Sequence, residues 1–395
     1  MDSDRYIVFE FDPDQPIERP RPQTRGSSRG GVETPVRPKV EVADLTPDEV
    51  TDARRKPGVV AAKPMPMTLV RPVASKAAPK PKGVGSEWGV DAVGATASPY
   101  TGDGIKVAVL DTGIDASHEA FQGAIVTEQD FTGEGNGDNV GHGTHCAGTI
   151  AGRDVNGHRI GVAPGVTEIL AGKVLSEQGG STESLLRGMQ WALDEGAAVI
   201  SMSLGIDFPG YVAYLVDSRG LPVQQATSMA LEEYRSTLQL FGSLAAFIRA
   251  NTMIGRTAIV VAATGNESER SGSPAYTIAI APPAASDGFI GVAALGREDD
   301  GSLGVAYFSN TGPAVAAPGV DILSAKPGGG YQLMSGTSMA TPHVAGVAAL
   351  WAESIQASTG RLEARELTAR LLASSIPVPG LGPGDIGAGL VQAPK

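Results

Sequence analysis

Short apolar runs rich in Val, Ile and Ala recur along the chain. Four of them cover residues 105–110, 167–174, 197–203 and 258–263. Segments with helical apolar spacing separate several of these runs, and such alternation predicts a parallel sheet with helices on both faces. The expected fold is therefore three-layer α/β with a central, mostly parallel sheet.

A longer apolar pattern lies between the third and fourth runs. Its apolar positions recur at helical spacing: Leu231, Tyr234, Leu238, Phe241, Ala245 and Ile248. This spacing predicts a helix over residues 226–253, which we interpret as an elongated scaffold helix. The preceding residues, 206–225, are expected to form a loop that could wall a neighbouring cleft.

The N-terminal segment, residues 1–82, has a different character. Residues 12–38 are dense in Pro, Arg, Gly and Ser, which is typical of a disordered linker. Around this linker we predict strands at 6–11, 39–42 and 59–62. The spacing of Thr46 and Glu49 predicts a capping box that opens a helix between the last two strands.

A basic connector follows. From residue 53 to residue 82 the chain carries eight Lys or Arg and no Asp or Glu. We interpret this part as an extended linker that is open to proteolysis.

The composition fits one large folded domain, residues 83–395, that follows the N-terminal segment in the sequence. The 395 residues are 42% hydrophobic and include 52 Gly, enough for a sizeable core with many tight turns. The net charge of −12 argues against nucleic acid as a partner. No apolar run approaches the roughly 20 residues of a membrane span. The acidic start lacks signal-peptide features, so we expect a cytoplasmic location, with non-classical export as the alternative.

The candidate chemistry centres on Ser338, which lies among small residues in the segment 336–346. We expect this serine at the first turn of a helix, with an exposed hydroxyl near free backbone N–H groups. A nucleophilic serine needs a base and a group that orients the base. His142, in the Gly-rich segment 141–148, and Asp111, at the end of the first apolar run, supply these types. Each residue alone is ambiguous.

These segments, together with 199–205 and 260–267, resemble the subtilisin-like (S8) serine peptidases over about residues 83–395. The order Asp, His, Ser is the one known for subtilisin itself. The resemblance implies a serine endopeptidase that cleaves protein or peptide substrates through a Ser338 acyl-enzyme, with an Asp111-His142-Ser338 triad. It also implies an oxyanion-hole residue, Asn266, and these substrate-binding residues: Ser203, Leu204, Gly205, Thr264 and Gly265.

The resemblance extends to the N-terminal segment, whose β-α-β pattern is similar to half of the family's inhibitory propeptide. We therefore expect residues 1–82 to inhibit the cleft and to be removed by a cut between about residues 63 and 86. Relative to the shortest family members, residues 206–253 form an insertion. A narrow-specificity processing protease, or a partner-docking factor with little general proteolysis, is the alternative function.

No metal or other cofactor is expected. His142 and His145 lack a third ligand in sequence, so they are a weak zinc signal, and we expect His145 to be structural. Calcium is not claimed, because the family's aspartate nine residues after the catalytic one is replaced by Ala120. The single cysteine, Cys146, is expected to follow the helix that carries His142 and to be inert packing near the active site.

Overall fold

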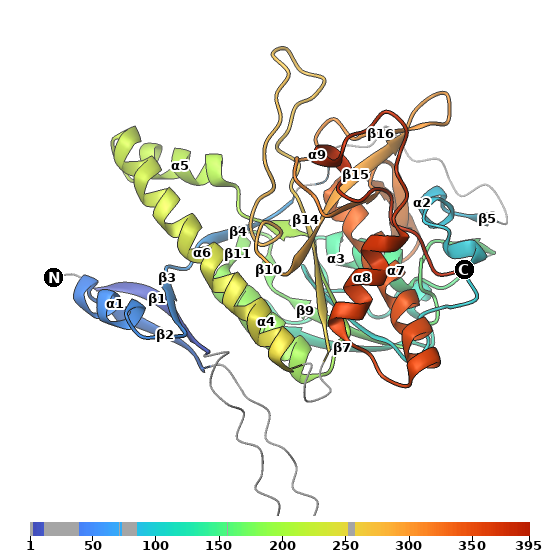
Figure 1. Cartoon of the computed structure of the whole chain (residues 1–395), viewed down its shortest axis with the longest axis horizontal. Coiled ribbons are helices and arrows are strands. Elements are labelled where there is room, and N and C mark those ends of the chain that lie inside the picture. Colours follow the sequence, from blue (N-terminus) through green and yellow to red (C-terminus); the bar gives the residue numbers. More distant parts are fainter. Residues whose placement is uncertain (1–2, 12–38, 71, 73–84, 156, 252–256) are drawn as a thin grey trace, which may run out of the picture.

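The computed structural model describes all residues except 1–2, 12–38, 71, 73–84, 156 and 252–256. Its centre is an eight-stranded sheet in the order β16-β15-β14-β12-β6-β9-β7, with β17 also paired to β15 (Figure 1). The strands are β6 (Lys106–Asp111), β7 (Ile125–Asp130), β9 (Glu168–Lys173), β12 (Val199–Met202), β14 (Ile259–Ala263), β15 (Phe289–Arg297), β16 (Leu303–Val305) and β17 (Val315–Pro318). All pairs are parallel except β15 with β16. The four strands predicted from the apolar runs are confirmed.

Helices cover both faces of this sheet. One face packs against α3 (His142–Ala151) and α7 (Thr337–Thr359), and the other against α4 (Thr182–Asp194) and α6 (Val223–Asn251). In β6, Val107 belongs to the core of the first face, whereas its neighbour Ala108 belongs to the core of the second. Successive side chains of a strand point to opposite faces, so both faces of β6 are buried. The predicted three-layer α/β fold is confirmed.

Shorter elements complete the structure around the sheet. Helix α8 (Ala364–Ser374) packs against α7 and β14. Further helices are α2 (Trp88–Ala92), α9 (Pro383–Ile386), and the 3-10 turns η1 (Ala95–Ala97) and η2 (Glu119–Phe121). Further strands are β5 (Gly85–Ser86), β8 (His158–Arg159), β10 (Leu175–Ser176), β11 (Gly179–Ser181), β13 (Leu204–Gly205), β18 (Ile322–Ala325) and β19 (Tyr331–Met334).

The N-terminal segment begins with a small antiparallel sheet in the order β2-β1-β3. Its elements are β1 (Asp4–Glu10), β2 (Lys39–Leu45), α1 (Pro47–Arg54) and β3 (Val59–Ala62). The predicted capping box is present: Thr46 N donates to Glu49 Oε2 at 2.8 Å, and Glu49 N donates to Thr46 Oγ1 at 3.4 Å. The predicted strands are confirmed. The linker predicted at 12–38 lies outside the described residues.

This small sheet packs on α6 (Figure 1). The ring of Phe11 meets that of Phe247 edge-on, with centroids 5.3 Å apart. Arg54 donates to Ser236 Oγ on α6 at 3.1 Å, and Arg5 forms an ion pair with Glu183 on α4 at 2.9 Å. The N-terminal segment is therefore docked on the same face of the molecule as α4 and α6.

The insertion contains more helix than the sequence predicted. The helix expected at 226–253 is confirmed as α6, but the loop expected at 206–225 is wrong, because it contains α5 (Phe208–Asp217). Asp207 caps α5 by accepting a hydrogen bond from Gly210 N at 3.0 Å, and Pro209 lies in the first turn. A separate small core of Leu215, Ala226 and Ala230 joins α5 to α6.

Candidate active site

Asp111 and His142 meet at the carboxyl end of the sheet. Asp111 is the last residue of β6 and His142 the first of α3, and Asp111 Oδ1 lies 2.8 Å from His142 Nδ1. Both side chains are 1% exposed. A Cβ on Gly143 would lie 2.1 Å from Gly113 O, so glycine is needed for α3 to approach the turn after β6 this closely.

The surroundings of His142 shift its pKa. Burial, the largest single cause, lowers the pKa, but the Asp111 carboxylate and the neighbouring Cys146 together outweigh burial, so the pKa lies well above its ordinary value. Cys146 Sγ lies 3.9 Å from His142 Nδ1. The expectation that Cys146 follows the helix is wrong: it lies within α3, one turn after His142, and is buried. Burial raises the pKa of its thiol, which therefore stays protonated at neutral pH.

Ser338 is the second residue of α7, as the sequence predicted, but its hydroxyl is not exposed. The segment around Val70 covers the Ser338 hydroxyl. Ser338 Oγ donates to Val70 O at 3.0 Å and also lies 3.3 Å from Ser203 O. Among the described residues, the buried His142 Nε2 has no hydrogen-bond partner. Ser338 Oγ and His142 Nε2 are therefore not hydrogen-bonded to each other in this state.

Asn266 lies beside the start of α7. Its Oδ1 accepts hydrogen bonds from Thr337 N and Thr337 Oγ1, both at 2.9 Å, which fixes the orientation of the side-chain amide. A Cβ on Gly336 would lie 3.0 Å from Asn266 Nδ2. The amide nitrogen thus lies near the backbone that precedes Ser338, as an oxyanion donor requires.

The predicted residues Thr264 and Gly265 shape the turn between β14 and Asn266. Thr264 Oγ1 donates to Val292 O at 3.0 Å, and Gly265 N donates to Thr337 Oγ1 at 3.2 Å. Gly265 has φ +112°, and a Cβ there would lie 2.3 Å from Glu267 Oε2. This position therefore requires glycine.

A strand of the N-terminal segment occupies the cleft. Strand β4 (Pro66–Leu69) lies between β11 and β13 and is antiparallel to both. Leu69 pairs with Leu204, and Thr68 pairs with Gly205. The strand predicted to bind substrate therefore pairs with the chain itself, by addition of a strand to an exposed edge.

Ser203, the residue that directly precedes β13, contacts the backbone of Ser338. Its Oγ donates to Ser338 O at 3.0 Å, and its side chain is buried. Sequence reasoning expected the end of the N-terminal segment to block the cleft, but it identified neither the other wall, β11, nor the residues that form β4. A signal for β4 was present, because Met65 and Met67 are buried and alternate with the exposed residues Pro66 and Thr68.

The other histidines are structural, as expected. His145 Nε2 lies 3.0 Å from Ile322 O, and His343 Nδ1 lies 2.8 Å from Met339 O. Burial lowers the pKa of His145 to about 3 and that of His343 to about 4, so both are neutral at physiological pH. His118 and His158 also have partners, Gly330 O and Glu87 Oε1, each at 2.8 Å.

One cluster of potential metal ligands occurs in the described part of the chain. The ligand atoms of Asp111, His142 and Cys146 lie within 4.8 Å of one another. All three residues are buried, and His142 Nδ1 is already bonded to Asp111. The arrangement suits a base with an orienting carboxylate and a neighbouring thiol.

A buried Asp-His pair, a serine at a helix N-terminus and a peptide strand laid across it define a serine peptidase of three-layer α/β fold. The comparisons agree with this class. The model of the subtilase family matches residues 102–383, and the chain belongs to this family. Across the described residues, no helix has both the length and the apolar character to cross a membrane.

Curated relatives are similar over most of the chain. An intracellular serine protease of Paenibacillus polymyxa is 36% identical over 287 residues, 70% of this chain and 76% of that protein. Subtilisin-like protease 5 of Arthroderma benhamiae is 36% identical over 258 residues, 63% of this chain and 52% of that protein. The protein of the same name from Arthroderma otae is 36% identical over 279 residues, which are 68% of this chain and 58% of that protein. The chain therefore spans little more than half the length of these fungal relatives.

Proposed function

We propose that this chain is a serine endopeptidase that hydrolyses peptide bonds through an acyl-enzyme on Ser338. The observation that carries the proposal is the meeting of three groups: the Asp111–His142 bond of 2.8 Å, the Ser338 hydroxyl, and a peptide carbonyl 3.0 Å from that hydroxyl. No cofactor takes part in this scheme. Activity should therefore survive treatment with EDTA.

The proposed chemistry gives each group a defined role, and His142 acts in both steps. Asp111 holds the Nδ1–H tautomer of His142, so that Nε2 can take the Ser338 proton as Oγ attacks the carbonyl carbon. Asn266 Nδ2 and the Ser338 backbone N–H would stabilise the oxyanion. The imidazolium then protonates the leaving amine, and water, activated by the same histidine, hydrolyses the acyl-enzyme.

Replacement of the nucleophile tests this assignment. Ser338→Ala should abolish hydrolysis and labelling by a fluorophosphonate, while the thermal unfolding of the protein stays close to that of the wild type. Ser324→Ala is a matched control, because it removes a buried hydroxyl that donates to His145 O at 2.8 Å and is not among the proposed site residues, so this variant should still be labelled. Labelling of Ser338→Ala at the wild-type level would refute the assignment.

We further propose that the N-terminal segment is an autoinhibitor. The support is the position of β4, which fills the cleft between β11 and β13, and of Val70, whose carbonyl oxygen lies at Ser338 Oγ. A protein substrate cannot pair with β13 while β4 does. The bond between residues 70 and 71 follows the carbonyl at Ser338, so we propose it as the processing site within the expected window of 63–86.

The mass of the protein over time tests autoinhibition. Wild-type protein should shorten to a form that begins at residue 71, with a matching rise in activity, and Ser338→Ala should stay at full length. Full activity of wild-type protein at unchanged full mass would refute autoinhibition while leaving the peptidase assignment intact.

A narrower specificity is the second candidate, and one pocket favours it. Beyond β13, a pocket of about 280 Å³ is walled by Phe208 of α5, by Leu231 and Tyr234 of α6, and by Glu267 next to Asn266. The insertion therefore borders the cleft. Slow digestion of casein alongside rapid cleavage of one or a few cellular proteins would favour this candidate, and rapid digestion of casein would exclude it.

For location, we propose the cytoplasm. The name of the Paenibacillus relative, an intracellular serine protease, supports this proposal. Fractionation of cells with an antibody to the chain tests it.

A further inference from the structure

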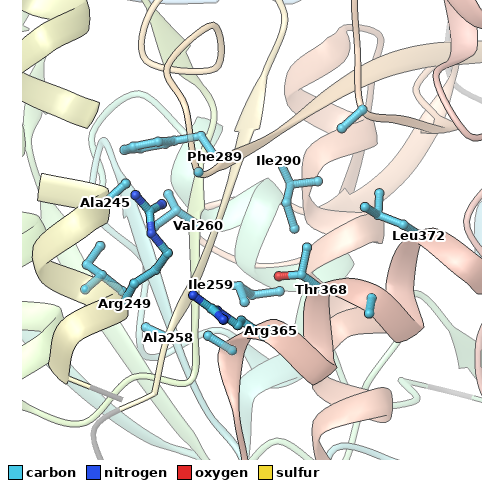
Figure 2. A pocket seen from close by; sticks show the side chains of 15 residues that line it. Ala245, Arg249, Ala258, Ile259, Val260, Phe289, Ile290, Arg365, Thr368 and Leu372 are labelled. Atoms are coloured by element: carbon cyan, nitrogen blue, oxygen red, sulfur yellow. The ribbon is translucent and has the colours of Figure 1, made fainter. Parts of the chain in front are cut away.

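A second pocket, of about 420 Å³, lies at the opposite end of β14 from Asn266. Its walls are α6 and α8, and its floor is formed by the beginnings of β14 and β15. The lining is mainly apolar, with these larger side chains: Ile248, Ile259, Phe289, Ile290 and Leu372 (Figure 2). A concave apolar site of this size is typical of a small-molecule site.

Two arginines are the charged members of the lining. Among the fifteen lining residues, Arg249 and Arg365 carry charge and none is acidic. Arg249 comes from α6, and in Figure 2 the side chain of Arg365 extends from α8 toward α6. Both arginines are exposed members of the lining, so an anionic group of a ligand can reach them from solvent.

The local backbone accommodates both arginines. Gly288 has φ +90°, and a Cβ there would lie 2.3 Å from Arg249 Nη1, so the glycine leaves space for the guanidinium. Arg365 is the second residue of α8, where a cation opposes the positive end of the helix dipole. The N-cap residue, Glu363, gives the first turn no side-chain hydrogen bond. An anion beside Arg365 would stabilise this helix start.

We propose that this pocket binds a small amphipathic carboxylate. The carboxylate pairs with Arg249 and Arg365, because guanidinium groups bind carboxylates through paired hydrogen bonds. The apolar body of the ligand packs against Phe289, Ile290 and Leu372. A fatty acid and the free C-terminus of a short peptide with an apolar last residue both have this chemistry.

Calorimetric titration of full-length Ser338→Ala protein, which should not hydrolyse peptides, tests the proposal. The probes are decanoate, acetyl-Leu-Phe with a free carboxylate, and acetyl-Leu-Phe amide. At least one carboxylate should bind saturably at one site per chain, and the amide should bind at least about tenfold more weakly. The carboxylate that binds with the higher affinity identifies the source of the ligand.

Variants then locate the site. Arg249→Gln and Arg365→Gln should each weaken binding at least about tenfold. Arg370→Gln is the matched control, because Arg370 lies on the same helix, pairs with Glu366 at 3.5 Å and does not line the pocket. Thermal melting checks that each variant is folded. No saturable binding of either carboxylate, equal binding of the amide, or an equal loss in Arg370→Gln would overturn the proposal. The readout is binding, so this outcome is independent of whether the chain is a peptidase.

Discussion

Substitution of Met67 provides the sharpest test of what keeps the N-terminal segment docked in the cleft. Its side chain is 1% exposed and belongs to the same core as Met65 and Leu185. Replacing a buried methionine by alanine costs about 2–5 kcal/mol. At about 1.4 kcal/mol per factor of ten, even the lower value weakens the docking of this segment about 30-fold.

A synthetic peptide of residues 64–70 with a free C-terminal carboxylate isolates this effect. It should inhibit the shortened, active enzyme competitively, because it can pair with β11 and β13 as β4 does. The peptide with Met67→Ala should have an inhibition constant at least about 30-fold higher. Steady-state hydrolysis of a chromogenic peptide provides the measurement.

The matched control is the peptide with Thr68→Ala. Thr68 is exposed, and its hydroxyl makes a long hydrogen bond of 3.4 Å to Gly205 O. Its loss should change the inhibition constant by no more than about threefold. If both peptides inhibit as well as the parent, or if Thr68→Ala has the larger effect, the segment is not held by the buried methionine and the reasoning fails.

Four further outcomes are expected. Asn266→Ala should lower turnover by about 10²–10³ with little change in KM, the magnitude known for the corresponding asparagine of subtilisin; a change confined to KM would contradict this role. The pKa of His142 is raised above its ordinary value, and the proposed base must be neutral, so the rate of shortening should rise with pH over the range in which His142 loses its proton, by at most about tenfold per pH unit; a flat profile would contradict it. Cys146→Ala should stay active, whereas a bulky mercurial should slowly inactivate the wild type by displacing α3; an inactive but folded variant would give the thiol a chemical role. The pKa values of His145 and His343 lie below that of an unfolded histidine, near 6.5, so protons bind the unfolded state first as the pH falls. As the pH falls from 6.5 to 4, each of these two histidines should therefore lower the free energy of unfolding by up to about 1.4 kcal/mol per pH unit. Urea unfolding at several pH values measures this loss.

The site residues that the sequence predicted correctly are those whose positions depend on local sequence patterns. Asp111 ends an apolar run, and a run of this kind forms a buried parallel strand whatever follows it. Ser338 follows Gly336 and precedes a long apolar helix, so its place at the start of α7 depends on neighbours in sequence. The resemblance to a family then supplied the roles.

The parts that were missed depend on contacts between distant segments. Strand β4 has four residues and begins with proline, a weak strand signal by itself. It is a strand because β11 and β13 offer it hydrogen-bonding edges on both sides. Helix α5 was not predicted, although Asp207 at the cap and Pro209 in the first turn are helix-start signals in the sequence.

The exposed hydroxyl predicted for Ser338 was wrong for a related reason. The residues of the site are fixed by β6, α3 and α7, but the partner of the hydroxyl is set by whatever occupies the cleft. With Val70 present, Ser338 donates to the Val70 carbonyl oxygen, and His142 Nε2 is buried without a partner among the described residues. Attack requires Ser338 to give its proton to that nitrogen instead. In the proposed scheme, the change of acceptor for the Ser338 hydroxyl, from Val70 O to His142 Nε2, therefore separates the inhibited arrangement from the catalytic one.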